Sequence, residues 1–132
     1  MNEYTDMSHI LPVVKEYTDI PFVLTHLAAS DPDVIERTAE SCPNDLFDTS
    51  IAFSGEHCIH RIHHELWEDD EKAAAFFRRI GCDRFAFGSD YPFGNPVNDI
   101  RRIRSLPLDE TEISMILGEN TARLYFRDES LI

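Results

Sequence analysis

The chain has 132 residues, and its 25 Asp and Glu outnumber its 12 Lys and Arg to give a formal net charge of −13. This acidic excess argues against binding to nucleic acid or to an anionic membrane, because both depend on Lys and Arg. The length and the hydrophobic content of 42% fit one globular domain, residues 1–132. No apolar run approaches the ~20 residues of a membrane helix and no signal-peptide pattern opens the chain, so we expect a cytoplasmic protein.

The three cysteines are Cys42, Cys58 and Cys82. An odd number without C-x-x-C spacing indicates neither a disulfide framework nor a thiolate zinc site. We therefore expect reduced thiols, with Cys42 and Cys82 acting as small apolar packing residues.

The first half of the chain predicts helix and strand in alternation. Apolar side chains at helical spacing indicate the helices, and short apolar runs without polar alternation indicate strands of a parallel sheet covered on both faces. We expect helices over residues 9–17 and 31–40 and strands over residues 22–24 and 45–50. Ser30 or Asp31 caps the second helix, whose first turn contains proline.

The second half continues the alternation after an irregular segment, residues 51–65. Acidic residues gather at the beginning of the next expected helix and basic residues at its end, before Gly81, which is the order that the helix dipole favours. Asp109 followed by Glu112 has the pattern of a capping box. We expect helices over residues 67–81, 95–106, 108–120 and 119–126 and a third strand over residues 84–90. These elements predict one α/β unit.

Chemically capable side chains stand at the ends of all three expected strands. The first strand ends in His26, the second in Asp48, Thr49 and Ser50, and the third in Ser89 and Asp90. In parallel α/β proteins the carboxyl ends of the strands meet at one edge, where catalytic residues gather. Each residue alone fits an ordinary packing, turn or capping role, but their shared position favours a site.

Longer motifs resemble a known family. Residues 81–94 read GCDRFAFGSDYPFG, and residues 118–126 read GENTARLYF. These motifs resemble the C-terminal part of the amidohydrolase-related family (amidohydrolase 2) of metal-dependent (β/α)8-barrel hydrolases and decarboxylases. The resemblance runs from about Leu11 to Phe126. It implies an α/β fold that corresponds to strands six to eight of a TIM barrel, with their helices.

The resemblance also implies roles for two strand-end residues. Asp90 corresponds to the aspartate at the end of strand eight, which binds the catalytic metal or accepts a proton from its bound water. His26 corresponds to the histidine at the end of strand six, which contacts the substrate or helps to activate that water. A divalent metal lowers the pKa of its water from ~15.7 to about 7, so a nearby carboxylate or imidazole can take the remaining proton. The implied metal is zinc, with manganese as the alternative.

The loop after Asp90 has an expected structural role. Pro92 restricts Tyr91 to extended geometry, and we expect Tyr91, Pro92 and Phe93 to fix the loop beneath the site with Asp90 pointing inward. The alternative role for Asp90 is a cap for the helix that begins near Pro96.

Part of the implied metal site is missing from the sequence. The family's first strand carries an H-x-H pair and its fifth strand another histidine, and no H-x-H occurs in the 132 residues. A complete barrel needs about 250 residues, so the chain corresponds to about half of one, and this chain alone can lack the metal. The first and third strands would each expose an unpaired edge, through which a homo-oligomer could form.

A histidine-rich segment could replace the missing ligands. His57, His60, His63 and His64 form H-x-x-H-x-x-H-H, in which His60 and His64 share a helix face at a spacing that can chelate zinc. Cys58 adds a sulfur donor. The simpler interpretation is a solvated loop and first helical turn, since histidine-rich tracts are compositional signals only.

The sequence leaves two functions open. The first is a metal-dependent hydrolase that cleaves a small amide, ester or lactone, or decarboxylates a small aromatic acid. The second is a non-catalytic truncated half-barrel or partner-binding module, which the missing H-x-H and the exposed strand edges suggest. A stand-alone flavodoxin-like domain is disfavoured, because three strands are few and no Gly-rich phosphate loop follows the first. The substrate is not specified, because specificity in this fold resides in loops.

Overall fold

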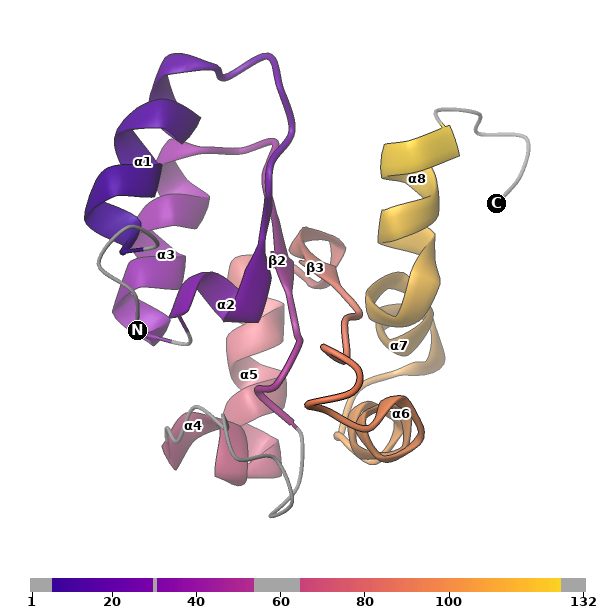
Figure 1. Cartoon of the computed structure of the whole chain (residues 1–132). Coiled ribbons are helices and arrows are strands. Elements are labelled where there is room, and N and C mark those ends of the chain that lie inside the picture. Colours follow the sequence, from indigo (N-terminus) through magenta and orange to yellow (C-terminus); the bar gives the residue numbers. More distant parts are fainter. Residues whose placement is uncertain (1–5, 30, 54–64, 127–132) are drawn as a thin grey trace.

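The computed structural model of the chain describes residues 6–29, 31–53 and 65–126. Its centre is a parallel sheet of three short strands in the order β1 (Val23–Leu24), β2 (Leu46–Asp48) and β3 (Phe85–Ala86). Val23 pairs with Leu46, and Phe47 pairs with Phe85. The three strands run downward in Figure 1, so their carboxyl ends share one edge of the sheet. The predicted strands are confirmed, and each is shorter than its sequence pattern.

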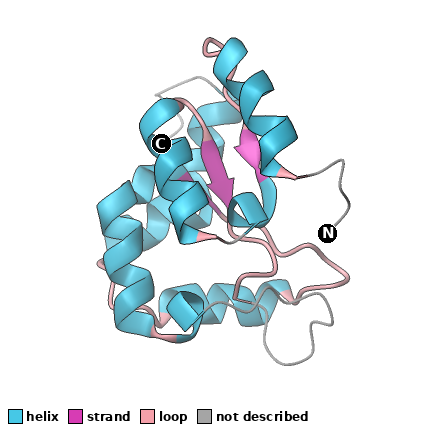
Figure 2. Ribbon diagram, turned by 90° about the vertical axis from the view of Figure 1, so that its left-hand side faces the viewer, coloured by secondary structure: helices cyan, strands magenta, loops and turns pink. Residues whose placement is uncertain are grey.

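Helices enclose this sheet. In Figure 1, α1 and α3 lie to the side of β1, while α7 and α8 lie beyond β3. Figure 2 shows the strands in the interior with helices around them. The helices are α1 (Met7–Glu16), α3 (Pro32–Ser41), α4 (Glu65–Glu68), α5 (Asp70–Ile80), α6 (Pro96–Arg104), α7 (Glu110–Ser114) and α8 (Asn120–Phe126), with a short turn α2 (Thr25–Ala29) after β1. No helix in the described residues is long and apolar enough to cross a membrane.

Local capping explains where several helices begin. Asp31, one of the two predicted caps, accepts a hydrogen bond from the Asp33 N–H at 2.9 Å. Asp69 caps α5 by accepting from the Lys72 N–H, and it divides the single predicted helix 67–81 into α4 and α5. Asp109 and Glu112 form the predicted capping box at α7. These polar side chains satisfy N–H groups that the first turn of a helix leaves without partners.

A π-helical segment, Met115–Glu119, lies between α7 and α8. It occupies the second half of the helix predicted over residues 108–120, and α8 corresponds to the separate helix predicted over residues 119–126. The Phe87 N–H donates to the Ile116 carbonyl in this segment at 2.8 Å. Asn120 is the residue that follows this segment. Its side-chain amide donates to the Phe85 carbonyl at 2.7 Å and to the Cys82 carbonyl at 2.8 Å. The end of the predicted helix is therefore joined to the sheet through both main-chain and side-chain hydrogen bonds.

These bonds close the outer edge of β3. The Thr49 N–H donates to the Ala86 carbonyl on the inner side of β3, so the Phe85 carbonyl and the Phe87 N–H face away from β2. Both of these outward groups bind the helical segment just described. In the described residues β3 has no strand neighbour on its outer side, as expected, and helix groups bind two of its outward main-chain groups.

Aromatic side chains form much of the core. Phe47, Phe77 and Phe85 are fully buried, and the rings of Phe77 and Phe85 meet edge to face with 4.4 Å between centroids. Trp67 is buried against Phe76 in a similar edge contact at 5.5 Å. Burial of a large apolar side chain contributes about 1.5–3 kcal/mol, so Trp67, whose ring also meets Phe53 and Phe77, anchors α4 to α5.

Arg84 binds the main chain at the amino-terminal edge of the sheet. Its guanidinium donates to the carbonyls of Asp45 at 2.8 Å and Cys42 at 2.6 Å. Asp45 is buried, and one of its carboxylate oxygens accepts from the Phe22 N–H at 3.1 Å. Burial raises the pKa of the Asp45 carboxyl, with the Phe22 hydrogen bond and the Arg84 charge opposing that shift. The end of α3 and the beginnings of β1 and β2 are thus held together.

The cysteines behave as expected for packing residues. Cys42 and Cys82 are free and buried. Burial raises the pKa of the Cys82 thiol to about 11, which keeps this thiol protonated at neutral pH. Cys58 lies outside the described residues.

Candidate active site

His26 follows β1 in a left-handed turn. His26, Leu27 and Ala28 have φ angles of 56°, 49° and 50°, so α2 is a turn of left-handed helix. This conformation costs roughly 1–2 kcal/mol for each residue that has a side chain. Leu27 and Ala28 are buried in the core, which stabilises the strained turn, while His26 stays partly accessible. The sequence did not predict this turn, since it contains neither glycine nor asparagine.

The loop after β2 carries Asp48, Thr49 and Ser50. The Ser50 N–H donates to the Asp48 carboxylate at 2.7 Å, which closes a tight turn. The Ser50 hydroxyl oxygen lies 2.8 Å from Nδ1 of His26. Thr49 faces β3, where its hydroxyl accepts from the Gly88 N–H at 3.3 Å. This loop therefore connects the ends of β1 and β3.

Asp90 lies on the loop after β3. It has a φ of 54°, and its carbonyl accepts from the N–H groups of Phe93 at 2.8 Å and Gly94 at 3.1 Å. The peptide bond between Tyr91 and Pro92 is cis. The Asp90 side chain is exposed. The loop thus presents this carboxylate to solvent from a compact turn.

Two expectations about this loop are settled by the structure. The side chains of Tyr91 and Phe93 are 78% and 51% exposed, so the prediction that they lie beneath the site is wrong. Asn95 caps α6 by accepting from the N–H groups of Val97 and Asn98, so Asp90 does not serve as that cap. The polar Asn95 side chain satisfies the helix terminus and leaves Asp90 available for another role.

Each of the three strand-end loops holds a non-glycine residue in the left-handed region. His26, Ile51 and Asp90 have φ angles of 56°, 55° and 54°. Backbone strain of this kind persists where the surrounding structure enforces it, and it concentrates at functional sites. Two of the three residues are those for which the sequence predicted catalytic roles. The strained backbone and the reactive side chains therefore occur at the same edge of the sheet.

The structure also reveals a close contact that the sequence analysis missed. A Cβ on Gly88 would lie 2.2 Å from the Asp48 carboxylate, which only glycine permits. The Asp48 side chain therefore links the end of β2 to the loop after β3. In the same way, the contact between His26 and Ser50 links the end of β1 to the end of β2. A glycine within a strand pattern is a sign of such close approach, and Gly88 lies within the strand that the sequence predicted over residues 84–90.

The described residues do not form a complete metal site. Within residues 6–29, 31–53 and 65–126, no group of three or more His, Cys, Asp or Glu side chains is arranged to hold a metal ion. Asp90 offers one exposed carboxylate. The residues present therefore do not by themselves fit a catalytic metal, which needs about three protein ligands. The predicted alternative ligands His57, His60, His63 and His64 lie outside the described residues.

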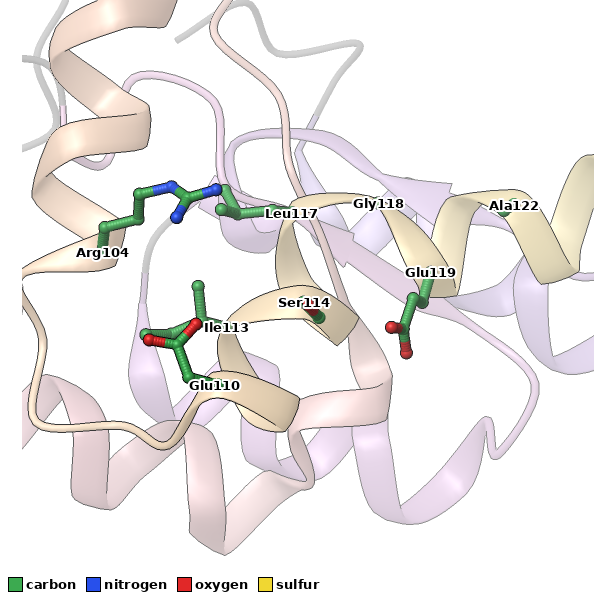
Figure 3. A pocket seen from close by; sticks show the side chains of 8 residues that line it. All are labelled: Arg104, Glu110, Ile113, Ser114, Leu117, Gly118, Glu119 and Ala122. Carbon is green, nitrogen blue, oxygen red and sulfur yellow. The ribbon is translucent and has the colours of Figure 1, made fainter. Parts of the chain in front are cut away.

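A separate cavity lies away from the strand ends. It has a volume of about 490 Å³ and lies among α6, α7, the π-helical segment and α8. Figure 3 shows Arg104 of α6 opposite Glu110 of α7 across this cavity. The lining residues are Arg104, Glu110, Ile113, Ser114, Leu117, Gly118, Glu119 and Ala122. None of these residues lies in a loop at the carboxyl end of a strand, so the cavity does not belong to the candidate site.

A small parallel sheet with reactive side chains along its carboxyl edge is the arrangement of part of a TIM-barrel enzyme. Two solved structures share this fold with a TM-score of 0.63 and 18% identity: 2,6-dihydroxybenzoate decarboxylase from Rhizobium, and 2,6-dihydroxybenzoate decarboxylase complexed with 2,6-dihydroxybenzoate. The likeness covers 92% of this chain, but only 41% of the Rhizobium chain and 40% of the chain in the complex. The chain thus spans about two fifths of their length.

A family model described as Amidohydrolase matches residues 2–127, and the chain therefore belongs to the amidohydrolase family. This confirms the resemblance that the sequence motifs indicated. Members of the family are generally metal-dependent. A search of curated proteins finds no match.

Proposed function

We propose that the chain is part of a metal-dependent hydrolase or decarboxylase in which Asp90 is a metal ligand and His26 transfers a proton to or from the substrate. In this proposal β1, β2 and β3 are strands six to eight of a (β/α)8 barrel, and residues 1–132 form a C-terminal portion of one domain. The observation that carries it is the placement of both residues, each with a left-handed backbone, along one edge of a parallel sheet.

The substrate class follows from the chemistry of these groups. An imidazole can accept or donate a proton near neutral pH, which serves both hydrolysis of an amide, ester or lactone and protonation of a carbon that loses carbon dioxide. The similar solved structures carry the name of a decarboxylase of 2,6-dihydroxybenzoate. This supports a small aromatic acid as the first substrate to try. Zinc is the proposed cofactor and manganese the alternative.

Paramagnetic NMR tests the metal role of Asp90 on the chain itself. Because Asp90 is a single ligand in the described residues, we expect weak binding: Mn²⁺ in excess over the ¹⁵N-labelled chain should broaden the amide signals of residues 88–91, and a larger excess of Zn²⁺ should restore them. Asp90→Asn should remove this broadening, because an amide is a poor ligand for a hard cation. Asp83→Asn, at another exposed carboxyl, is the matched control and should leave the broadening in place. Broadening centred on Asp69 and Asp70, or unchanged in Asp90→Asn, would contradict the proposal.

Turnover provides the second test. Release of carbon dioxide from 2,6-dihydroxybenzoate, or cleavage of an aryl ester, is measured with Zn²⁺ or Mn²⁺ present. Asp90→Asn and His26→Gln should each lower any metal-dependent turnover by at least about 10²-fold, the usual effect of losing an acid–base group. Retained turnover in either variant, with the fold intact by circular dichroism, would rule out the assigned role.

A second candidate function is a partner-binding module, which the edge of β1 favours. In the described residues no further strand pairs with β1 on the side away from β2. Apolar side chains in the segment that leads into β1 are about half exposed: Val13, Tyr17 and Ile20. We propose association of two copies along this edge as the alternative to catalysis.

Native mass spectrometry discriminates the two candidates, because it reads the oligomeric state and bound metal together. A metal-free dimer that Ile20→Glu converts to monomer would support the module. The matched control is Tyr125→Glu, which places the same charge at an exposed aromatic on α8. A monomer that binds one metal ion would support the enzyme and exclude self-association.

A further inference from the structure

The hydroxyl of Ser50 is buried beside the imidazole of His26. Ser50 is 4% exposed, and its Oγ lies 2.8 Å from Nδ1 of His26. The two residues come from the loops after β2 and β1, which are adjacent strands. Such a contact between strand-end loops requires both loops to be held in register.

The loop that carries Ser50 is fixed on both sides. The Ser50 N–H donates to Asp48 at 2.7 Å, and the Asp48 carboxylate lies against the α-carbon of Gly88. The Thr49 N–H donates to the Ala86 carbonyl at 2.9 Å. Ser50 therefore cannot shift without disturbing the main chain of β3, and it offers His26 an anchored partner.

The backbone of His26 is also fixed. It belongs to the left-handed turn whose next two residues, Leu27 and Ala28, are buried in the core. The imidazole of a histidine can rotate about its side-chain bonds, and either of its ring nitrogens can carry the proton. The hydrogen bond at Nδ1 constrains both, because it binds one specific nitrogen of the ring.

The donor in this hydrogen bond follows from the buried hydroxyl. A buried hydroxyl proton needs an acceptor, and among the described residues Nδ1 of His26 lies within hydrogen-bond distance. If the Ser50 hydroxyl donates to Nδ1, neutral His26 carries its ring proton on Nε2. When His26 gains a second proton, Nδ1–H donates to Oγ instead, because a hydroxyl both donates and accepts. One side chain can thus hold the ring through a full protonation cycle.

We propose that Ser50 is a positioning residue that sets the tautomer and orientation of His26, so that Nε2 is the nitrogen that exchanges a proton with substrate. The role in catalysis rests on the proposed function of His26. The tautomer itself does not depend on that function and can be measured on the chain alone.

Nitrogen NMR of the ¹⁵N-histidine-labelled chain is the test. The signal of His26 is identified by its loss in His26→Gln, and exposed His9 serves as an internal reference in the same spectrum. At a pH where His26 is neutral, we expect Nδ1 to show the shift of an unprotonated acceptor and Nε2 that of a protonated nitrogen. The opposite pattern in the unmodified chain would overturn the proposal without any further variant.

Variants of Ser50 complete the test. Ser50→Ala should lower the ratio of the Nε2–H to the Nδ1–H tautomer about fivefold, equivalent to the ~1 kcal/mol of an ordinary hydrogen bond. Ser50→Thr keeps the hydroxyl and should restore the ratio. Thr38→Val, which removes a buried hydroxyl that bonds within α3, is the matched control and should leave the His26 signals unchanged. An unchanged ratio in folded Ser50→Ala would show that Ser50 does not set the tautomer.

The outcomes separate this inference from the proposed function. A tautomer that depends on Ser50, together with full turnover in His26→Gln, would retain the hydrogen-bond assignment and reject the catalytic role. If His26→Gln loses turnover while the His26 tautomer is the same with and without the Ser50 hydroxyl, the catalytic role of His26 is retained and the positioning role of Ser50 is rejected.

Discussion

At the scale of single residues, strained backbone marks the same positions as reactive side chains. His26 and Asp90 both have φ angles near 55°. Histidine and aspartate tolerate this region better than most residues, but glycine occupies it without steric cost. His26 and Asp90 therefore carry a steric cost that glycine would avoid.

Substitutions at Asp90 measure the strain directly. Asp90→Gly should be more stable than Asp90→Ala by roughly 0.5–1 kcal/mol, because the left-handed penalty for alanine exceeds the larger unfolded-state entropy of glycine. Both variants lose the carboxylate, so their difference isolates the backbone term. Urea denaturation of the two variants gives the result. Equal stability, or a more stable Ala variant, would show that position 90 is not left-handed in solution.

The buried carboxyl of Asp45 should make stability depend on pH. Burial raises its pKa above the ordinary 3.8, so the folded chain retains a proton that the unfolded chain releases. The contribution of this group to stability is therefore full below pH 3.8 and is lost as the pH rises through the raised pKa of the folded state.

Asp45→Asn tests this dependence. The stability of the unmodified chain minus that of Asp45→Asn should fall as the pH rises above 3.8, because only the unmodified chain must ionise a buried group. Urea denaturation of both proteins at several pH values up to 7 measures this difference. A difference that increases with pH would mean that Arg84 stabilises the carboxylate more than burial destabilises it.

At the scale of elements, the edge of β3 is closed by a helix instead of a strand. The Asn120 amide and the Ile116 carbonyl bind the outward groups of Phe85 and Phe87. A π-helical segment lies where this contact occurs, and such segments are frequent at functional sites. The same contact holds the main chain just before the Gly88, Ser89 and Asp90 loop.

Removal of the Asn120 side chain should loosen this edge. Asn120→Ala leaves two buried carbonyls, on Cys82 and Phe85, without their donor and should cost about 2–4 kcal/mol. Asn98→Ala, at an exposed asparagine of α6, should change stability by less than about 0.5 kcal/mol. Thermal denaturation followed by circular dichroism measures both variants. A small effect at Asn120 would mean that water replaces the amide at the β3 edge.

Local sequence pattern predicts most helices and little of the geometry between elements. Caps such as Asp31 and Asp109 act on N–H groups within three residues, so the sequence reveals them. The left-handed turn at His26 depends on burial of Leu27 and Ala28, and the π-helical segment depends on contact with Phe87. These are long-range causes that no local pattern records. The pairing of His26 with Ser50 likewise depends on the register of Val23 with Leu46.

At the scale of the whole molecule, the net charge of −13 is the dominant electrostatic feature. Repulsion among like charges destabilises a compact state, and salt screens it with a Debye length of ≈ 10 Å at 0.1 M. Raising NaCl from about 0.01 to 0.3 M should therefore raise the Tm. Choline chloride at equal ionic strength should act similarly, since screening does not depend on the cation. A Tm that falls with both salts would show that attractive ion pairs outweigh the repulsion.

The closed edge of β3 limits how copies of this molecule can assemble. A sheet with two open edges can add neighbours at both sides and grow into an open polymer. Here only the β1 edge remains available in the described residues, so a pairwise contact there must use the same surface on both copies. Such a contact is two-fold symmetric and complete after one partner is added. If copies associate along the described β1 edge, we therefore expect the assembly to end at a pair.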